Sequence, residues 1–329
     1  MATSRTARIH RPTPHNLELL AAALRRGELV AVPTETVYGL AADATNPEAC
    51  AAIFRAKGRP ANDPLIVHVL DLKQAAEVAE LNEAARQLAE RFWPGPLTLV
   101  LPKRSIIPDV ATSGGPTVAV RMPAHPLMRR ILRLAKRPLA APSANPFGYV
   151  SPTTARHVSD GLGSQIRFIL DGGPCTIGLE STIVDLRDAR RPVVLRPGAI
   201  TAQQISEALG TPVRSRRKVV STKRAAAAPG MLARHYSPRT PVVLHGRLPD
   251  VTPPDEARVH FRRADSDGKA NTFHLSEDGS GRSAARRLFG VLRDLDRGRW
   301  RRLHIELAPG DDPLAAAIND RLRRAAARD

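Results

Sequence analysis

Between residues 14 and 208, short aliphatic runs alternate with segments whose apolar residues recur every three or four positions. The first pattern is typical of buried strands and the second of amphipathic helices, so the alternation predicts an α/β domain. Strands are expected at 29–33, 65–70, 97–101, 117–121, 138–142, 166–171, 181–186 and 193–196. Helices are expected at 14–26, 47–57, 72–80, 83–92, 125–135, 152–160 and 202–209. Because turns rather than helices separate some of these strands, we expect a twisted mixed sheet, whose strand order the sequence does not give.

Two helices carry clear end signals. Asn46 is a good N-cap for the helix over 47–57, which is expected to stop at Gly58. Two prolines then keep the helix from resuming, and the run 65–69 is apolar on both faces except for His68. The last helix has a capping box, Thr201-x-x-Gln204, and Gly210 as its stop. The run 65–69 therefore predicts a strand covered on both sides.

The turn between that helix and strand holds the first candidate chemistry. It brings Lys57, Arg59 and Asn62 close to His68, an arrangement that suits an anionic substrate. The simpler interpretation is that Lys57 complements the helix C-terminus and that His68 is a hydrogen-bonded core histidine. These residues alone leave both interpretations open.

The chain is expected to have three parts: a main domain over 14–208, a basic linker over 209–240 and a small domain over 241–329. Residues 211–228 are basic, alanine-rich and without periodicity, which is typical of a linker. In the last part we expect a strand at 241–245, a polar middle region, a helix at 283–297, a strand at 302–307 and a helix at 313–327. That order predicts a small open α/β layer.

Composition places the protein among globular proteins. Of its 329 residues, 42% are hydrophobic and 25% are charged, which is ordinary for a soluble chain of this length. No apolar run approaches the roughly 20 residues that span a bilayer, and the basic N-terminus lacks the apolar core of a secretory signal, so we expect no membrane association and a cytoplasmic location. Cys50 and Cys175 are too few for a disulfide framework or a zinc site, and we expect both to be buried.

The positive charge is concentrated in the linker. The net charge is +18, and residues 209–240 contribute +8 without a single acid. Residues 241–329 hold 17 basic and 14 acidic residues, so that part is nearly balanced. Such an excess of positive charge attracts polyphosphates or RNA. A generally arginine-rich composition explains the charge equally well.

Polar turns follow several predicted strands, and strand ends are where α/β sheets bind ligands. The turn Pro33-Thr34-Glu35-Thr36 supplies hydroxyls and a carboxylate. Further polar turns begin at Arg121, Ser143, Ser181 and Arg196. Each has a structural alternative: for example, Ser151 can cap a helix and Arg196 can pair with a surface carboxylate. Five such turns in one domain favour a binding cleft.

The absence of several motifs limits the classes of reaction that the sequence supports. The chain has no G-x-x-x-x-G-K-[ST] loop, no G-x-G-x-x-G and no G-x-S-x-G. No histidine pair or cysteine cluster indicates a metal site. What remains is a cationic, hydroxyl-lined cleft, in which catalysis is mainly positioning and electrostatic stabilisation of a phosphate ester.

At this point the motifs resemble a known family. PTETVYGL at 33–40, KGRP with PLIVH at 57–68, PSAN at 142–145, ESTIVD at 180–185 and RPGAI at 196–200 are similar to the YrdC-like domain of threonylcarbamoyl-AMP synthases. PGM at 229–231, HYSP at 235–238 and NDRLRRAA at 319–326 resemble the longer, two-domain form. The match covers nearly all of 14–329. Residue 228 is alanine where the family often has serine.

The resemblance implies a nucleotidyltransferase, an L-threonylcarbamoyladenylate synthase. Threonine takes up bicarbonate, and the resulting carbamate attacks the α-phosphate of ATP to give threonylcarbamoyl-AMP and pyrophosphate. A tRNA threonylcarbamoyl-transferase partner then modifies the adenosine next to the anticodon. Mg²⁺ is expected to arrive with ATP, and a weak tRNA contact through the basic linker is a further expectation.

The resemblance also assigns roles to residues. The catalytic group would be Lys57, Arg59, Ser143 and Asn145. L-Threonine would bind to Thr36, His68, Arg121, Ala141 and Ser181, with Arg121 on the amino-acid carboxylate. ATP would contact Arg59, Asn62, Asp63, Thr117, Ser143, Ser151, Arg196, His235 and Tyr236. The last two would close over the nucleotide as part of the linker.

Two alternatives remain. An RNA-binding module of this fold would explain the charge, but it predicts base-stacking aromatics, which are only 4% of the chain. A carbamoyl-transfer enzyme of hydrogenase maturation would keep the fold and change the reaction, but it would carry acylphosphatase and zinc-finger segments, which this sequence lacks.

Overall fold

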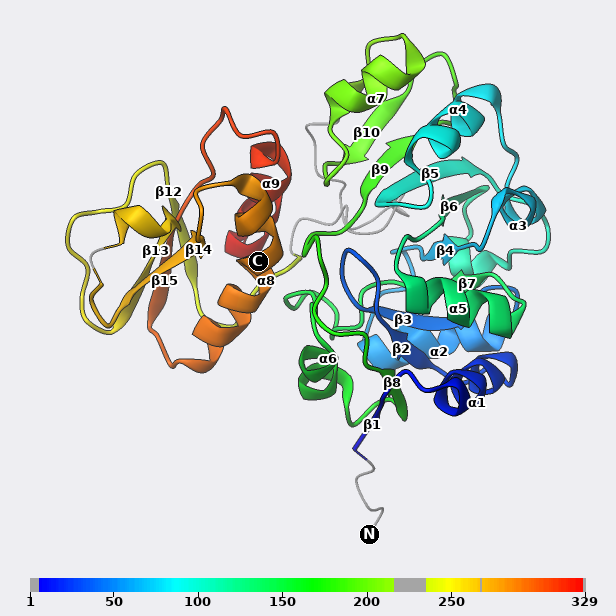
Figure 1. The fold of residues 1–329 in the computed structure, drawn as a ribbon, viewed down its shortest axis with the longest axis horizontal. Helices are drawn as coiled ribbons and strands as arrows, with labels where there is room; N and C mark the ends of the chain where they lie inside the picture. Colours follow the sequence, from blue (N-terminus) through cyan, green and yellow to red (C-terminus); the bar gives the residue numbers. More distant parts are fainter. Residues whose placement is uncertain (1–5, 216–234, 267, 328–329) are drawn as a thin grey trace.

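The computed structural model describes residues 6–215, 235–266 and 268–327. Within them the chain forms a large domain around a long sheet and a small C-terminal domain around a second sheet (Figure 1). Most of the predicted linker, including the PGM motif at 229–231, lies outside the described residues. Among the residues described, no helix is both long and apolar enough to cross a membrane.

The large sheet is mixed, as predicted. Its strand order is β1-β8-β2-β3-β7-β4-β6-β5-β9-β10-β11. The strands are β1 (Arg8–His10), β2 (Val30–Val32), β3 (Gly39–Asp43), β4 (Ile66–His68), β5 (Leu97–Pro102), β6 (Thr117–Arg121), β7 (Leu139–Ala140), β8 (Phe168–Leu170), β9 (Thr182–Asp185), β10 (Val193–Arg196) and β11 (Arg214–Ser215). The sheet contains antiparallel pairs, such as β2 with β3, and parallel pairs, such as β4 with β6.

Helices cover both faces of this sheet. They are α1 (Pro14–Arg25), α2 (Pro47–Lys57), α3 (Leu72–Val78), α4 (Glu83–Phe92), α5 (Pro126–Ala135), α6 (Ala155–Leu162) and α7 (Ala202–Leu209). Val30 and Val32 of β2 pack with α1 and α5 in one apolar cluster, whereas Ala31 belongs to the cluster with α2 on the other face. This follows from the alternation of side chains along a strand.

The predicted helix ends are confirmed for α2 and α7. The Asn46 side chain accepts from the backbone N–H of Glu48 and Ala49, and Gly58 ends α2 in the left-handed conformation. Thr201 and Gln204 form the predicted capping box of α7, and Gly210 ends that helix. The helix expected at 152–160 begins later, at Ala155, because Thr154 rather than Ser151 is its N-cap.

Three strands of the large sheet were not predicted. β3 is made of Gly39-Leu-Ala-Ala-Asp, and small residues give a weak strand signal even though all five are buried. β1 and β11 are short and mostly exposed, so they lack an apolar pattern. β11 lies in the segment predicted as linker but pairs with β10.

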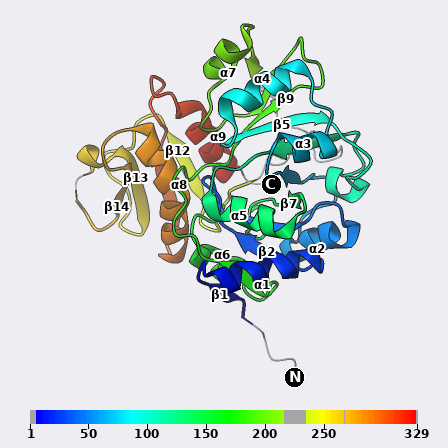
Figure 2. The same ribbon diagram turned by 45° about the vertical axis from the view of Figure 1, so that its right-hand side comes forward.

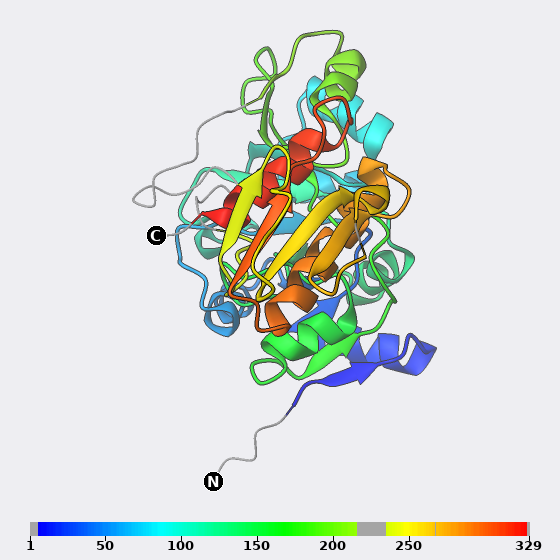
Figure 3. The same cartoon turned by 90° about the vertical axis from the view of Figure 1, so that its left-hand side faces the viewer.

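The small domain has a four-stranded parallel sheet, β12-β15-β13-β14. Its elements are β12 (Val242–His245), β13 (Glu256–Arg262), β14 (Thr272–Ser276), α8 (Gly281–Arg297), β15 (Arg302–Glu306) and α9 (Ala315–Ala326). β13 and β14 occupy the region left unassigned because it is polar. In β13 the apolar residues Ala257, Val259 and Phe261 alternate with polar ones and pack on the helices. In Figure 3 the strands lie in front of both helices.

The two domains meet along α8 and α9, which face the large domain (Figures 1 and 2). The Tyr149 hydroxyl donates to the Asp296 carboxylate, and Arg297 pairs with Asp160. Gly178 has a positive φ of 82°, and a Cβ there would lie 2.5 Å from the Cα of Arg286. The close approach of the domains at this point therefore requires glycine.

Candidate active site

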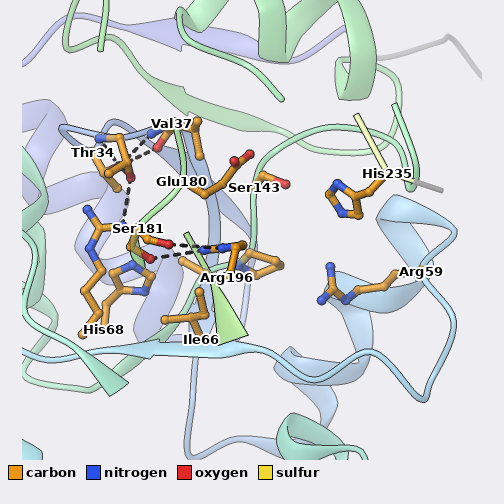
Figure 4. Close-up of a pocket in the computed structure, with 15 residues that line it drawn as sticks. Thr34, Val37, Arg59, Ile66, His68, Ser143, Glu180, Ser181, Arg196 and His235 are labelled. Atoms are coloured by element: carbon orange, nitrogen blue, oxygen red, sulfur yellow. Dashed lines mark hydrogen bonds between the residues drawn. The ribbon is translucent and has the colours of Figure 1, made fainter. Parts of the chain in front are cut away.

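Strand ends and turns of the large domain enclose a small cavity of about 40 Å³. It is lined by Thr34, Thr36, Val37, Gly39, Arg59, Ile66, His68, Arg121, Ala141, Pro142, Ser143, Glu180, Ser181, Arg196 and His235. Figure 4 shows Arg59 and His235 at one end, and His68, Thr34 and Ser181 at the other. The cavity thus has a cationic end and a hydroxyl-rich end.

Arg121 ends β6 at the hydroxyl-rich end and is buried. Its guanidinium donates to the Thr36 hydroxyl at 2.8 Å, to the Glu35 carboxylate at 2.6 Å and to the Gly95 carbonyl at 3.2 Å. Burial alone would raise the pKa of Glu35, but the Arg121 charge and its hydrogen bond outweigh burial and hold that pKa below its ordinary value. Arg121 therefore faces the cavity as a fixed cation.

The turn that carries Glu35 and Thr36, the partners of Arg121, is held by threonine hydroxyls within the turn itself. The Thr34 hydroxyl lies 2.8 Å from the Thr36 hydroxyl and donates to the Val37 carbonyl at 2.6 Å. The backbone N–H groups of Thr36 and Val37 donate back to the Thr34 oxygen. Since these bonds hold the turn without a ligand, the Thr36 side chain is already oriented towards Arg121.

His68 lines the cavity next to Arg121 and is held neutral. Burial and the Arg121 charge lower the pKa of His68 to about 3. Its Nδ1 has no hydrogen-bond partner among the described residues. The Nδ1 atom of His68 is therefore available to a ligand.

Lys57 is buried behind the cationic end. Its ammonium donates to the backbone carbonyls of Ser143 and Asn145, at 2.6 and 2.5 Å. Burial and the nearby Arg59 charge lower the pKa of Lys57 well below its usual value. Lys57 therefore fixes the PSAN turn from behind, and its ammonium does not complement the end of its own helix.

Arg59 lines the cavity from the turn after α2. Its Nε donates to the Asp63 carbonyl at 2.8 Å, and its Nη2 donates to the Pro64 carbonyl at 2.7 Å and pairs with the Asp63 carboxylate at 2.9 Å. The side chains of both residues are almost fully buried. The ion pair compensates the buried charge and directs the guanidinium at the cavity.

Ser181 connects three strands at the cavity wall. Its hydroxyl shares a hydrogen bond with Thr98 at 2.7 Å, and Arg196 donates to its carbonyl and its hydroxyl at 3.1 and 3.2 Å. The preceding residue, Glu180, accepts a hydrogen bond from the Ser151 hydroxyl at 2.5 Å. The alternatives of a helix-capping Ser151 and a surface-paired Arg196 are therefore wrong.

His235 and Tyr236 approach the cavity from the end of the linker. His235 lines it and is buried, and burial together with the charge of Arg59 lowers the pKa of His235 well below its usual value. Its ring packs edge-on against Phe147, with centroids 6.2 Å apart. Tyr236 is fully buried and has a positive φ of 64°. Both side chains occupy space between the two domains.

Nine of the predicted site residues line the cavity: Thr36, Arg59, His68, Arg121, Ala141, Ser143, Ser181, Arg196 and His235. Five more lie directly behind it and contact this lining or each other: Lys57, Asp63, Asn145, Ser151 and Tyr236. Asn62 lies in the turn between Arg59 and Asp63. Thr117 starts β6 at the end opposite Arg121, roughly 13 Å away along the strand.

Some lining residues were not assigned from the sequence: Thr34, Val37, Gly39, Ile66, Pro142 and Glu180. Thr34 was noted only as a hydroxyl of the turn. Glu180 belongs to the ESTIVD motif at 180–185 but received no role, and its position next to the strand-end Ser181 is the signal that could have identified it. The described residues contain no group of three or more His, Cys, Asp or Glu that could hold a metal ion.

Comparison with known proteins identifies the family. The sequence model of the family described as telomere recombination, Sua5_yciO_yrdC, matches residues 22–198, and the model of the threonylcarbamoyl-AMP synthase C-terminal domain matches residues 200–327. A threonylcarbamoyl-AMP synthase from Pyrococcus abyssi is 42% identical over 94% of this chain and 93% of its own length. This chain belongs to the threonylcarbamoyl-AMP synthase family.

Other members of the family agree with this result. The threonylcarbamoyl-AMP synthase of Bacillus subtilis is 46% identical over 68% of this chain and 65% of its own length. The crystal structure of P. abyssi Sua5 complexed with L-threonine has a TM-score of 0.87 and 39% identity, and the match covers 97% of this chain and 96% of that one. The predicted two-domain, YrdC-like fold of the family is therefore confirmed.

The buried, neutral His68 predicts a pH dependence of stability. In the unfolded chain its imidazole titrates near its ordinary pKa of 6.5, whereas the folded value is about 3. The unfolded state therefore binds more protons below pH 6.5, and the free energy of unfolding is expected to fall as pH drops from there towards 3. Between pH 7 and 5, His68 should account for roughly 2 kcal/mol of that fall.

Urea unfolding of wild type and His68→Gln at both pH values measures this difference. The variant should lose less stability on acidification than wild type does. His15→Gln, a change at an exposed histidine, is the control and should behave as wild type. Parallel losses in wild type and His68→Gln would show that His68 is not held neutral.

Proposed function

We propose that the protein is an L-threonylcarbamoyladenylate synthase and thus a nucleotidyltransferase. The observation that carries this proposal is the cavity itself, in which a fixed cation and hydroxyls at one end lie next to buried cations at the other. An amino acid suits the first end and a polyphosphate the second. The relatives named for this activity, one of them solved with L-threonine, support it.

Two steps account for the product. The threonine amine adds to bicarbonate and loses water, giving an N-carboxylate. One oxygen of that carbamate attacks the α-phosphate of ATP, the bond to the β-phosphate oxygen breaks, and pyrophosphate leaves with its electron pair. The product is a mixed anhydride, threonylcarbamoyl-AMP.

At the amino-acid end, we propose that Arg121 binds the threonine carboxylate. Its three hydrogen bonds leave two of the five guanidinium N–H donors for a ligand. Thr36, Ser181 and the backbone at Ala141 would surround the rest of the amino acid, and the neutral His68 would accept or donate one hydrogen bond without adding charge.

At the phosphate end, we propose that Arg59 and Ser143 contact the phosphates and stabilise the charge that develops on them. Lys57 would act through the turn at Ser143 and Asn145, which it holds in place. Arg196, Ser151, Asn62 and Asp63 would lie along the nucleotide, and His235 with Tyr236 would cover it. Thr117 contributes only if the nucleotide extends along β6.

Magnesium would enter as the counter-ion of ATP. Glu180, the carboxylate in the cavity lining, already accepts from Ser151 and pairs with Arg321, so it fits poorly as a metal ligand. The phosphates would then supply most of the ligands of the ion, as is common for Mg²⁺. The ion supplies charge neutralisation on the phosphates.

The product would be used outside this protein. A mixed anhydride of a carbamate is labile in water, so its consumer must act close by. We propose a tRNA threonylcarbamoyl-transferase as that partner and the cytoplasm as the place of reaction, with tRNA contact through the basic linker as a minor addition.

The test is pyrophosphate release by the purified protein. Release should require L-threonine, bicarbonate and MgATP together, and threonylcarbamoyl-AMP should appear in equal amount by mass spectrometry. Omission of any one substrate, or replacement of threonine by valine, should remove the signal. Release that does not depend on threonine and bicarbonate would refute the assignment.

A further inference from the structure

A charged contact between the domains reaches the wall of the cavity. Arg321, on α9 of the small domain, is completely buried. Its Nε donates to the Glu180 carboxylate at 2.9 Å, and its Nη2 lies 3.5 Å from the Glu180 carbonyl. Its Nη1 donates to Asp320 at 2.8 Å. Arg321 thus hydrogen-bonds to Glu180, a lining residue of the cavity that lies 141 positions away in the sequence.

Glu180 is held from both sides. One carboxylate oxygen accepts from the Ser151 hydroxyl of the large domain, and the other accepts from Arg321 of the small domain. The next residue, Ser181, carries the contacts to Thr98 and Arg196. A shift of Glu180 would therefore move the cavity wall where Ser181 presents its hydroxyl.

Arg321 also holds Tyr236. Its guanidinium lies over the Tyr236 ring, 5.3 Å from the centroid, and the same ring stacks on Phe289 of α8 at 5.4 Å. Tyr236 has a positive φ, a conformation that a bulky residue keeps only when its surroundings enforce it. The cation–π contact and the stacking are such surroundings.

We infer that Arg321 is a positioning residue of the active site: from the small domain it fixes Glu180 in the cavity wall and Tyr236 beside it. The small domain then supplies part of the site's architecture. The kinetic consequence of this inference rests on the proposed function, whereas its structural consequence does not.

Arg293 is a matched control at the same interface. It is also a buried arginine of the small domain, and it donates to the backbone carbonyls of Val150, Ser151 and His157. None of these three residues lines the cavity. Its removal weakens the docking of the domains and leaves both contacts of Arg321, to the Glu180 carboxylate and to the Tyr236 ring, in place. Of the partners of Glu180, only Ser151 loses a contact, and that contact is to its backbone carbonyl.

The kinetic test compares Arg321→Met, Arg293→Met and the double variant Glu180→Gln/Arg321→Met. In Arg321→Met, the KM values for threonine and ATP should rise about tenfold, with a smaller change in kcat. Arg293→Met should lose thermal stability but keep its KM values. In the double variant both members of the ion pair are replaced by neutral side chains, so stability should largely recover while the KM values stay high.

Three results would overturn the inference. They are wild-type KM values in Arg321→Met, equal KM increases in Arg293→Met, and recovery of both stability and KM in the double variant. In each case Arg321 would serve only to dock the domains. The KM values of Arg321→Lys should lie between those of wild type and Arg321→Met, because an ammonium keeps the charge but not the planar arrangement of donors.

Hydrogen exchange separates this inference from the proposed function. Without ligands, amides at 179–184 and 236–237 should exchange faster in Arg321→Met than in wild type, and Arg293→Met should not show this local change. If wild type releases no threonine-dependent pyrophosphate, the proposed function fails and the exchange result still decides the role of Arg321. Unchanged exchange in Arg321→Met would refute that role.

Discussion

Arg121→Met is expected to raise the Kd for L-threonine roughly 100-fold or more and to leave ATP binding nearly unchanged. The guanidinium is the fixed cation at the hydroxyl-rich end of the cavity, where we propose that the amino acid binds, and hydrogen bonds to a charged group contribute about 1.5–3 kcal/mol each. The same change leaves Glu35 buried without its cation, so the free energy of unfolding should fall by about 3–5 kcal/mol. Calorimetric titration with each ligand and urea unfolding measure the two effects.

A second variant separates binding from folding. Glu35→Gln/Arg121→Met removes both buried charges, so it should regain most of the lost stability. Threonine affinity should stay low because the cation is still missing. Recovery of threonine binding in this double variant would mean that Arg121 only stabilises the turn at Thr36.

Arg59→Met is expected to lower kcat/KM for ATP by about 100- to 1,000-fold, with threonine affinity little changed. A preorganised group that stabilises charge in the transition state contributes about 2.7–4 kcal/mol. Arg59 fits that description, because its ion pair with Asp63 and its two carbonyl contacts hold the guanidinium at the cavity. Steady-state pyrophosphate release at varied ATP measures the effect.

The controls address the loss of the ion pair. Arg59→Met/Asp63→Asn also neutralises the buried carboxylate that has lost its pairing with Arg59, so it should fold better than the single variant. Its kcat/KM for ATP should stay as low as that of the single variant. Arg91→Met, at an exposed position of α4, should have wild-type kinetics. Restored turnover in the double variant would show that Arg59 acts through folding alone.

The sequence predicted the parts of the site that depend on local signals. The cap at Asn46, the stop at Gly58 and the apolar run at 65–69 predict a turn and a strand that carry Arg59 and His68. Positions at the start or end of aliphatic runs likewise predicted Arg121, Ser181 and Arg196 as site residues. These signals are short-range, so no knowledge of the strand order was needed.

What the sequence did not predict depends on contacts between distant segments. Lys57 hydrogen-bonds to backbone carbonyls 86 and 88 positions away, and backbone atoms carry no sequence signal. The pairing of Glu180 with Arg321 likewise requires the docking of two domains. β3 and β13 were missed for a different reason, because small or polar residues replace the usual apolar run.

The apolar core of the small domain does not end at the domain boundary. The cluster that contains Phe289 and Leu292 of α8 also contains Val37, Val150 and Leu179 of the large domain. Val37 lies next to Thr36 in the turn that faces Arg121. Unfolding of the small domain would therefore expose a side chain of the binding turn to water. In thermodynamic terms the cooperative unit includes both sheets, although the chain topology divides them.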